Sequence, residues 1–165
     1  MTRRLFLLLL VGCLTWLRGP AVAADTLPTG VAELITTDGR RVAVQVEVAA
    51  TGPARARGLM HRKSLPQDAG MWFDFGRTAP IAMWMKNTEI ALDMLFVAAD
   101  CTVVRVAENR RPGSLAHVRS GGPIRYVLEV NAGFAAREGI KEGSCVRLRS
   151  APGVERGERL GKALQ

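Results

Sequence analysis

The chain has 165 residues, of which 48% are hydrophobic, and it carries a formal net charge of +8. This length predicts a single domain that can bury a core of its own, and no internal repeat argues for more. The basic residues are scattered and do not cluster with aromatic side chains, so the charge does not predict nucleic-acid binding. We therefore expect no nucleic-acid partner.

The first 23 residues are typical of a secretory signal peptide. Arg3 and Arg4 precede an apolar run over Leu5–Leu17, and small residues lead to Ala23, after which we expect cleavage. The run has about 13 residues, fewer than the roughly 20 that a membrane-spanning helix needs. This predicts a periplasmic or secreted protein with no transmembrane anchor after processing. Loss of Arg3, Arg4 and Arg18 reduces the net charge from +8 to +5.

The cysteines bear on the cellular compartment. Leu10–Cys13 resembles a lipoprotein cleavage box, but apolar residues follow it where a polar tether would be expected, so we favour the signal peptide over lipidation of Cys13. Only Cys101 and Cys145 remain after cleavage, and an exported protein meets an oxidising compartment. A disulfide requires their Cα atoms within about 7 Å, so the sequence leaves open a bridge or two free thiols.

A β-hairpin is predicted after a short linker over residues 24–30. Val31–Thr36 and Arg41–Val48 are rich in β-branched residues, and in the second run apolar and polar residues alternate. Asp38 and Gly39 between the runs supply the positive φ angles of a tight turn. One face of this hairpin should be buried and the other exposed to water.

A short helix is expected next. Thr51 can cap the free amides of its first turn, Pro53 fits that turn, and Gly58 ends it. The helix exit delivers Leu59 and Met60 to the core, and a loop follows over residues 64–70.

Three strands are then expected in close succession, over Met71–Phe75, Ile81–Met85 and Leu92–Val97. Their short links favour antiparallel neighbours, because parallel neighbours need long crossovers. The third run is apolar on both faces except for Asp93, which predicts a central strand covered on two sides. A carboxylate in that position needs a partner.

The C-terminal part is predicted to contain three more strands, one long loop and one short helix. The strands cover Val103–Ala107, Tyr126–Val130 and Cys145–Leu148, the loop 109–123 and the helix Ala132–Glu138. Residues 151–165 should form a flexible tail. Many short strands and two small helices predict a mainly β single domain over residues 31–150, as a β-sandwich or a partly closed barrel.

Four ordered motifs resemble a known family. They are RGLMHR (Arg57–Arg62), GMWFDF (Gly70–Phe75), MWMKNTEIALDMLFV (Met83–Val97) and YVLEVNAGFAAREGIKEGS (Tyr126–Ser144). In order and spacing they are similar to the exported proteins of domain-of-unknown-function family number 192, over about Val31–Leu148. The resemblance implies a compact, jelly-roll-like β domain, often behind a signal peptide. It implies no established activity and supplies no catalytic residues.

Nine polar residues form the candidate site: Arg57, His61, Arg62, Lys86, Asn87, Thr88, Asp93, Glu129 and Asn131. In a structural interpretation, the Asn87 and Thr88 side chains hold their turn by bonding backbone amides. Asp93 then forms a buried ion pair with Arg57 or Arg62. In a functional interpretation they bind a small polar or anionic ligand or an envelope polysaccharide. We expect a monomeric binding module rather than an enzyme, with no catalytic residue, metal or cofactor assigned.

Two other functions compete with this prediction. Met83 and Met85 would share a face on a strand, and with His61 beside Met60 their thioethers could bind Cu(I), although methionines usually pack in cores. Asp93 and Glu129 could form a hydrolytic carboxylate pair, which requires a separation of roughly 5 to 9.5 Å on one face.

Overall fold

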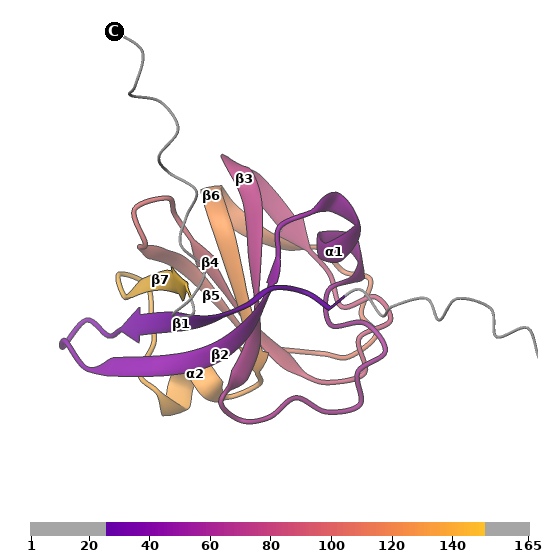
Figure 1. The fold of residues 1–165 in the computed structure, drawn as a ribbon, viewed down its shortest axis with the longest axis horizontal. Coiled ribbons are helices and arrows are strands. Elements are labelled where there is room, and N and C mark those ends of the chain that lie inside the picture. Colours follow the sequence, from indigo (N-terminus) through magenta and orange to yellow (C-terminus); the bar gives the residue numbers. More distant parts are fainter. Residues whose placement is uncertain (1–25, 151–165) are drawn as a thin grey trace, which may run out of the picture.

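The computed structural model describes residues 26–150, which form seven strands and two short helices (Figure 1). The signal peptide predicted over residues 1–23, Cys13 and the tail predicted from residue 151 lie outside the described residues. Within residues 26–150, neither helix is long and apolar enough to cross a membrane. The elements are β1 Thr29–Ile35, β2 Arg41–Ala49, α1 Gly52–Arg57, β3 Ala69–Met83, β4 Leu92–Val97, β5 Val103–Arg110, β6 Val118–Asn131, α2 Phe134–Arg137 and β7 Cys145–Ser150.

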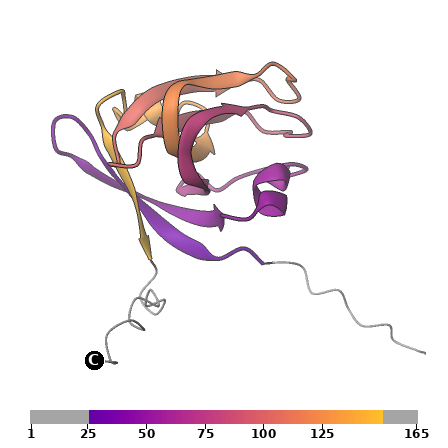
Figure 2. The same ribbon diagram turned by 90° about the horizontal axis from the view of Figure 1, so that it is seen from above.

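The seven strands form one curled sheet in the order β5-β4-β6-β3-β2-β1-β7. Figure 2 shows the curl, with the β1–β2 hairpin on one side and the later strands on the other. All neighbouring strands are antiparallel except β2 and β3, which are parallel and joined by a crossover that contains α1. The result is a half-barrel, which confirms the predicted mainly β fold in its partly closed barrel form.

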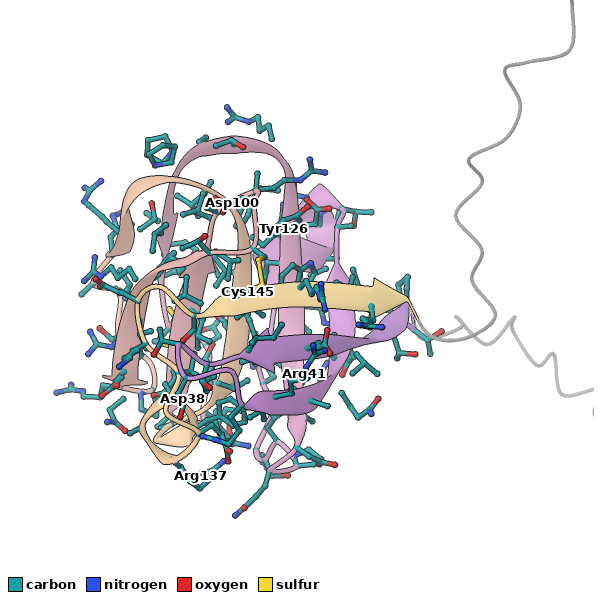
Figure 3. All side chains as sticks on the ribbon, turned by 90° about the vertical axis from the view of Figure 1, so that its left-hand side faces the viewer. Asp38, Arg41, Asp100, Tyr126, Arg137 and Cys145 are labelled. Carbon is teal, nitrogen blue, oxygen red and sulfur yellow. A yellow bond between two sulfur atoms is a disulfide. The ribbon has the colours of Figure 1, made fainter. Side chains whose placement is uncertain are left out.

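The two edges of the sheet meet at a disulfide between Cys101 and Cys145, whose Cα atoms are 4.9 Å apart (Figure 3). Around it, the Val103 amide donates to the Ser144 carbonyl and the Val146 amide to the Cys101 carbonyl, both at 2.7 Å. Cys101 and Cys145 are therefore a bridge rather than two free thiols, and they close the barrel where β5 begins and β7 begins.

The outer face of β7, β1 and β2 carries an ion-pair cluster centred on Glu33 of β1. Arg147 and Arg149 of β7 and Arg41 of β2 all pair with its carboxylate, at 2.7, 3.1 and 2.9 Å. Figure 3 looks onto this face, where Arg41 is labelled. The arginines lower the pKa of Glu33 to about 2, so it stays ionised over the whole physiological range.

The first two of the three predicted central strands are one strand. β3 continues through residues 76–80. Its pairing with β6 is interrupted after Asp74 and resumes at Ala79, with register shifts between Asp74 and Ala79 and between Pro80 and Ala82. Gly76 has a φ of 71°, which suits glycine and bends the strand without ending it. The link predicted between Met71–Phe75 and Ile81–Met85 is therefore a bend in one long strand. The prediction of a separate strand at Ile81–Met85 was wrong.

The loop predicted over residues 109–123 is confined to residues 111–117, since β5 runs to Arg110 and β6 begins at Val118. Gly121, with a φ of 80°, and Pro123 lie inside β6, where Pro80 of β3 faces Pro123. Two strands that bend together can hold glycine and proline residues that would end an isolated strand. The short link between β3 and β4 had suggested that they are neighbours. In the sheet, however, β6 lies between them.

The core has two parts, one on each face of the central strands. Inside the barrel Trp72, Leu95 and Leu128 pack together with Phe134 of α2. On the outer face, Phe73 and Phe96 pack with Leu59, which follows α1. All six residues of β4 are buried, as predicted for a strand covered on both faces.

Thr51 caps α1 as predicted. Its side chain accepts a hydrogen bond from the Ala54 amide at 3.3 Å, a proline occupies the first turn, and the helix ends at Gly58 with a φ of 48°. The parallel β2–β3 crossover thus begins with a helix whose two ends are set by local sequence.

Replacing Gly70 with alanine should weaken the pairing of β3 with β6. An added Cβ would lie 2.6 Å from the Glu129 carbonyl oxygen, so two central strands would have to move apart. We expect Gly70→Ala to lower the free energy of unfolding by about 1–3 kcal/mol in urea denaturation. Gly122→Ala, in β6, is the matched control because nothing described lies within 4 Å of its added Cβ. Equal stability of the two variants would contradict the close approach at Gly70.

Candidate functional site

A cavity of about 280 Å³ lies between α1, the end of β3, the turn at Lys86–Thr88 and β6, and we call it the α1 pocket. Figure 1 shows α1 beside one end of the barrel. The polar side chains that line the pocket include Arg57, Lys86, Thr88 and Glu129, and its apolar wall includes Leu59, Met60, Phe73, Phe75, Met83 and Trp84. Hollows of about 410 and 650 Å³ lie near α2 and near Leu115, and neither contains Glu129.

Glu129 is the buried ionisable residue among those that line the pocket. It lies on β6 opposite Met71 of β3 and Met94 of β4, and only 4% of it is exposed. Burial raises the pKa of its carboxyl group to about 8, so the group is neutral at pH 7. Among residues 26–150 no side chain or backbone group forms a hydrogen bond or ion pair with this carboxyl group. Burying a carboxyl group without a hydrogen-bond partner is costly, and the Glu129 carboxyl group is buried in this way beside a cavity.

Two cations lie at the exposed side of the same pocket. Arg57 is the last residue of α1, and Lys86 follows the end of β3 with its ammonium group 5.2 Å from the centre of the Trp84 ring. Within the described part of the chain, neither has an ion-pair partner among the acidic residues. By contrast, Arg55 donates to the carbonyls of Ala50 and Asp74, which fastens α1 to β3. The pocket therefore combines a positive exposed side with a neutral buried carboxyl group.

The turn that carries Lys86 is built by local hydrogen bonds. The Thr88 amide donates to the Met85 carbonyl at 3.1 Å, and the Thr88 hydroxyl donates to the Lys86 carbonyl at 3.3 Å. Asn87 has a φ of 55°, a left-handed conformation that asparagine tolerates better than most residues. Thr88 is buried beside the pocket, whereas Asn87 is exposed and does not line it.

His61 and Arg62 hold the chain after α1 in place and do not line the pocket. The His61 amide donates to the Asn87 carbonyl at 2.8 Å, and the His61 side chain is exposed. Arg62 forms a two-pronged ion pair with Glu47 of β2, at 2.5 and 2.7 Å. This pair lowers the pKa of Glu47 and raises that of Arg62. The helix exit is therefore tied to the sheet by groups that we had considered for ligand binding.

Asn131 is also structural. Its side-chain amide donates to the Leu65 carbonyl at 3.0 Å and to the Pro66 carbonyl at 2.9 Å, and so fixes the loop before β3. The sequence motif that contains Asn131 thus marks a loop anchor.

Asp93 has partners, as predicted, but they are backbone amides rather than Arg57 or Arg62. It is fully buried, and its two carboxylate oxygens accept from the Asn109 amide at 2.8 Å and the Ala135 amide at 2.9 Å. It therefore holds the end of β5 and the start of α2 against β4.

Asp93 and Glu129 face opposite sides of the sheet. In the β4–β6 register Asp93 lies opposite Val130, which belongs to the core inside the barrel, whereas Glu129 lies opposite Met94 of the outer core. Residues directly opposite each other share a face of the sheet, so the Asp93 and Glu129 carboxyl groups lie on different faces. The hydrolytic carboxylate pair is excluded by this register.

The methionine pair predicted for Cu(I) is not gathered at the pocket. β3 ends at Met83, which lines the pocket, and Met85 is 1% exposed and packs in the outer core. Both side chains pack in the outer core, Met85 as a buried member and Met83 as a partly buried neighbour, which is the packing role that methionines usually have. Met60 lines the pocket instead, with the Asn87 side-chain amide 3.9 Å from its sulfur.

The structure thus brings together four of the nine predicted site residues, Arg57, Lys86, Thr88 and Glu129. Sequence reasoning missed the apolar wall of the pocket. Phe73 and Phe75 alternate with Asp74 in the sequence, but nothing in that alternation distinguishes a pocket wall from a closed core. Trp84 offered a signal in the sequence, as a large aromatic residue two positions before the polar turn, and the structure shows it to be 43% exposed.

The fold and the pocket define a small half-barrel domain with one polar cavity beside its first helix. The profile of domain-of-unknown-function family 192, described as "Uncharacterized ACR", matches residues 33–148, and the chain belongs to this family. No curated protein matches the chain.

Two solved structures are similar to this one. A candidate transcription regulator from Sinorhizobium meliloti 1021 has a TM-score of 0.74 and 42% sequence identity, over 76% of this chain and 97% of the other. A protein of unknown function from Novosphingobium aromaticivorans DSM 12444 has a TM-score of 0.72 and 36% identity, over 76% of this chain and 89% of the other.

Proposed function

We propose that this protein is an exported module that binds a small organic ligand in the α1 pocket. The observation that carries the proposal is Glu129, a buried carboxyl group that lines a cavity and has no partner among residues 26–150. Such a group costs stability in the empty protein, and proteins retain costly groups of this kind chiefly where function needs them. The pocket volume of about 280 Å³ suits a small molecule better than a polymer chain.

Export is part of the proposal. The bridge between Cys101 and Cys145 supports it, because structural disulfides persist in oxidising compartments and are rare in the cytosol. The signal-peptide pattern over residues 1–23 supports it independently.

A fragment screen by thermal shift tests the binding function. We expect several small organic compounds to raise the melting temperature of the purified protein by mass action. Ala82 is exposed on β3 and lines the pocket, so Ala82→Phe should fill the cavity and abolish these shifts without disturbing the core.

The matched control is Ala43→Phe, which places the same side chain at an exposed position of β2 away from the pocket. It should leave the thermal shifts unchanged. The proposed function would be wrong if no fragment shifted the melting temperature, or if every shift survived in Ala82→Phe.

A further inference from the structure

The charges around the α1 pocket are unevenly placed, and this restricts the ligand class. Arg57 and Lys86 lie at the exposed side, and the described residues supply no acidic partner to either. Two unpaired cations favour an anionic group on the ligand through charge-assisted hydrogen bonds. A cationic ligand would have to pass both of them.

The middle of the pocket is apolar. Phe73, Phe75 and Trp84 supply aromatic faces and Met83 an adaptable thioether, so a ring or a short aliphatic body can be buried there. This wall connects the exposed side, where Trp84 lies below Lys86, to the buried side, where Phe73 lies.

Few charged groups face Glu129 at the buried side. Its neighbours across the sheet are Met71 of β3 and Met94 of β4, and the charged pocket residues from α1 and the turn are Arg55, Arg57 and Lys86. Arg55 is occupied by backbone carbonyls. Glu47 of β2, in the same row beyond Met71, is occupied by Arg62.

We propose that the α1 pocket takes an amphipathic organic anion in one orientation, and this rests on the proposed function. The anionic group lies between Arg57 and Lys86, and the apolar body packs against the aromatic wall. A hydrogen-bond acceptor at the far end, such as a carbonyl or ether oxygen, receives the proton of the neutral Glu129 carboxyl group. The acceptor gives a partner to the Glu129 carboxyl group, which has none among residues 26–150.

Three compounds with one body and different head groups test the ligand class. They are 4-methoxyphenylacetate, the neutral 4-methoxyphenethyl alcohol and the cationic 4-methoxyphenethylamine, each titrated by calorimetry at pH 6.5. We expect the anion to bind most tightly. Arg57→Gln and Lys86→Gln should each weaken it about tenfold and leave the alcohol unchanged. The amine binding most tightly would overturn the inference.

The pH profile tests the role of Glu129. Anion affinity should be constant up to about pH 8, where Glu129 ionises, and should then fall by up to tenfold per pH unit. Glu129→Gln keeps an N–H donor in place of the carboxyl proton, so it should still bind the anion but with a flat profile. A falling profile that persists in Glu129→Gln would assign the pH dependence to other groups and contradict this role.

The two proposals can fail separately. If the alcohol or the amine binds and Ala82→Phe abolishes that binding, while the anion does not bind, the pocket is a ligand site but the ligand class is wrong. The binding function itself is wrong if Ala82→Phe abolishes the binding of none of the three compounds and of no fragment.

Discussion

Replacing Glu129 with glutamine is expected to raise the free energy of unfolding at pH 7 by on the order of 3 kcal/mol. The pKa of Glu129 is about 8 in the folded protein and 4.5 in an unstructured chain. Between these two values the folded protein keeps a proton that the unfolded chain has released, so stability falls as the pH rises from 4.5 to 8. Glutamine has no proton to release and therefore avoids this loss.

Urea denaturation at pH 4 and pH 7 measures the effect. Both proteins should be about equally stable at pH 4, because Glu129 is then protonated in both the folded and the unfolded states. Glu89→Gln, at an exposed position next to the pocket turn, is the control and should show no gain that depends on pH. A Glu129→Gln variant no more stable than the native protein at pH 7 would mean that the native carboxyl group has a partner.

Removing the disulfide should lower the free energy of unfolding by about 4 kcal/mol and the melting temperature by roughly 10–15 °C. Cys101 and Cys145 are 44 residues apart in sequence, so their bridge removes much of the freedom of the unfolded chain. They also hold together the first residues of β5 and β7, which otherwise share only a few backbone hydrogen bonds.

Thermal melts with and without a reducing agent test this in one experiment. Reduction should lower the melting temperature of the native protein to that of the Cys101→Ala, Cys145→Ala double variant, which reduction should leave unchanged. If the double variant melted at the native temperature, the bridge would not be what closes the barrel.

Local sequence signals predicted most of the elements. α1 begins after Thr51 and ends at Gly58 as expected. The turn at Asp38 and Gly39 joins the first hairpin, but of these two residues only Gly39 has a positive φ, of 87°. The errors came from glycine and proline residues at Gly76, Pro80 and Pro123, which the sequence alone places in turns. They sit in strands because β3 and β6 bend at the same level and keep pairing, and that depends on a partner more than 40 residues away in sequence.

The candidate site was predicted in part for a similar reason. Lys86 and Thr88 are two residues apart in one polar turn, so their proximity is local. Glu129 and Asp93 look alike in sequence, as single carboxylates in apolar strands, and only the register of β4 against β6 places one in a pocket and the other under α2. Register is set by the whole sheet and could not be derived from either segment.

β5 and β7 lie at the two ends of the sheet and are joined only at the bridge between Thr102 and Cys145, and unpaired strand edges invite pairing with a second chain. β7 carries Arg147 and Arg149, which are exposed and gathered around Glu33, and β5 carries the exposed Glu108. Charged side chains on edge strands are a common protection against intermolecular strand addition. Arg147 and Arg149 therefore give the incomplete barrel a means to resist aggregation, since a strand that added to β7 would place its own side chains beside two guanidinium groups on the outer face.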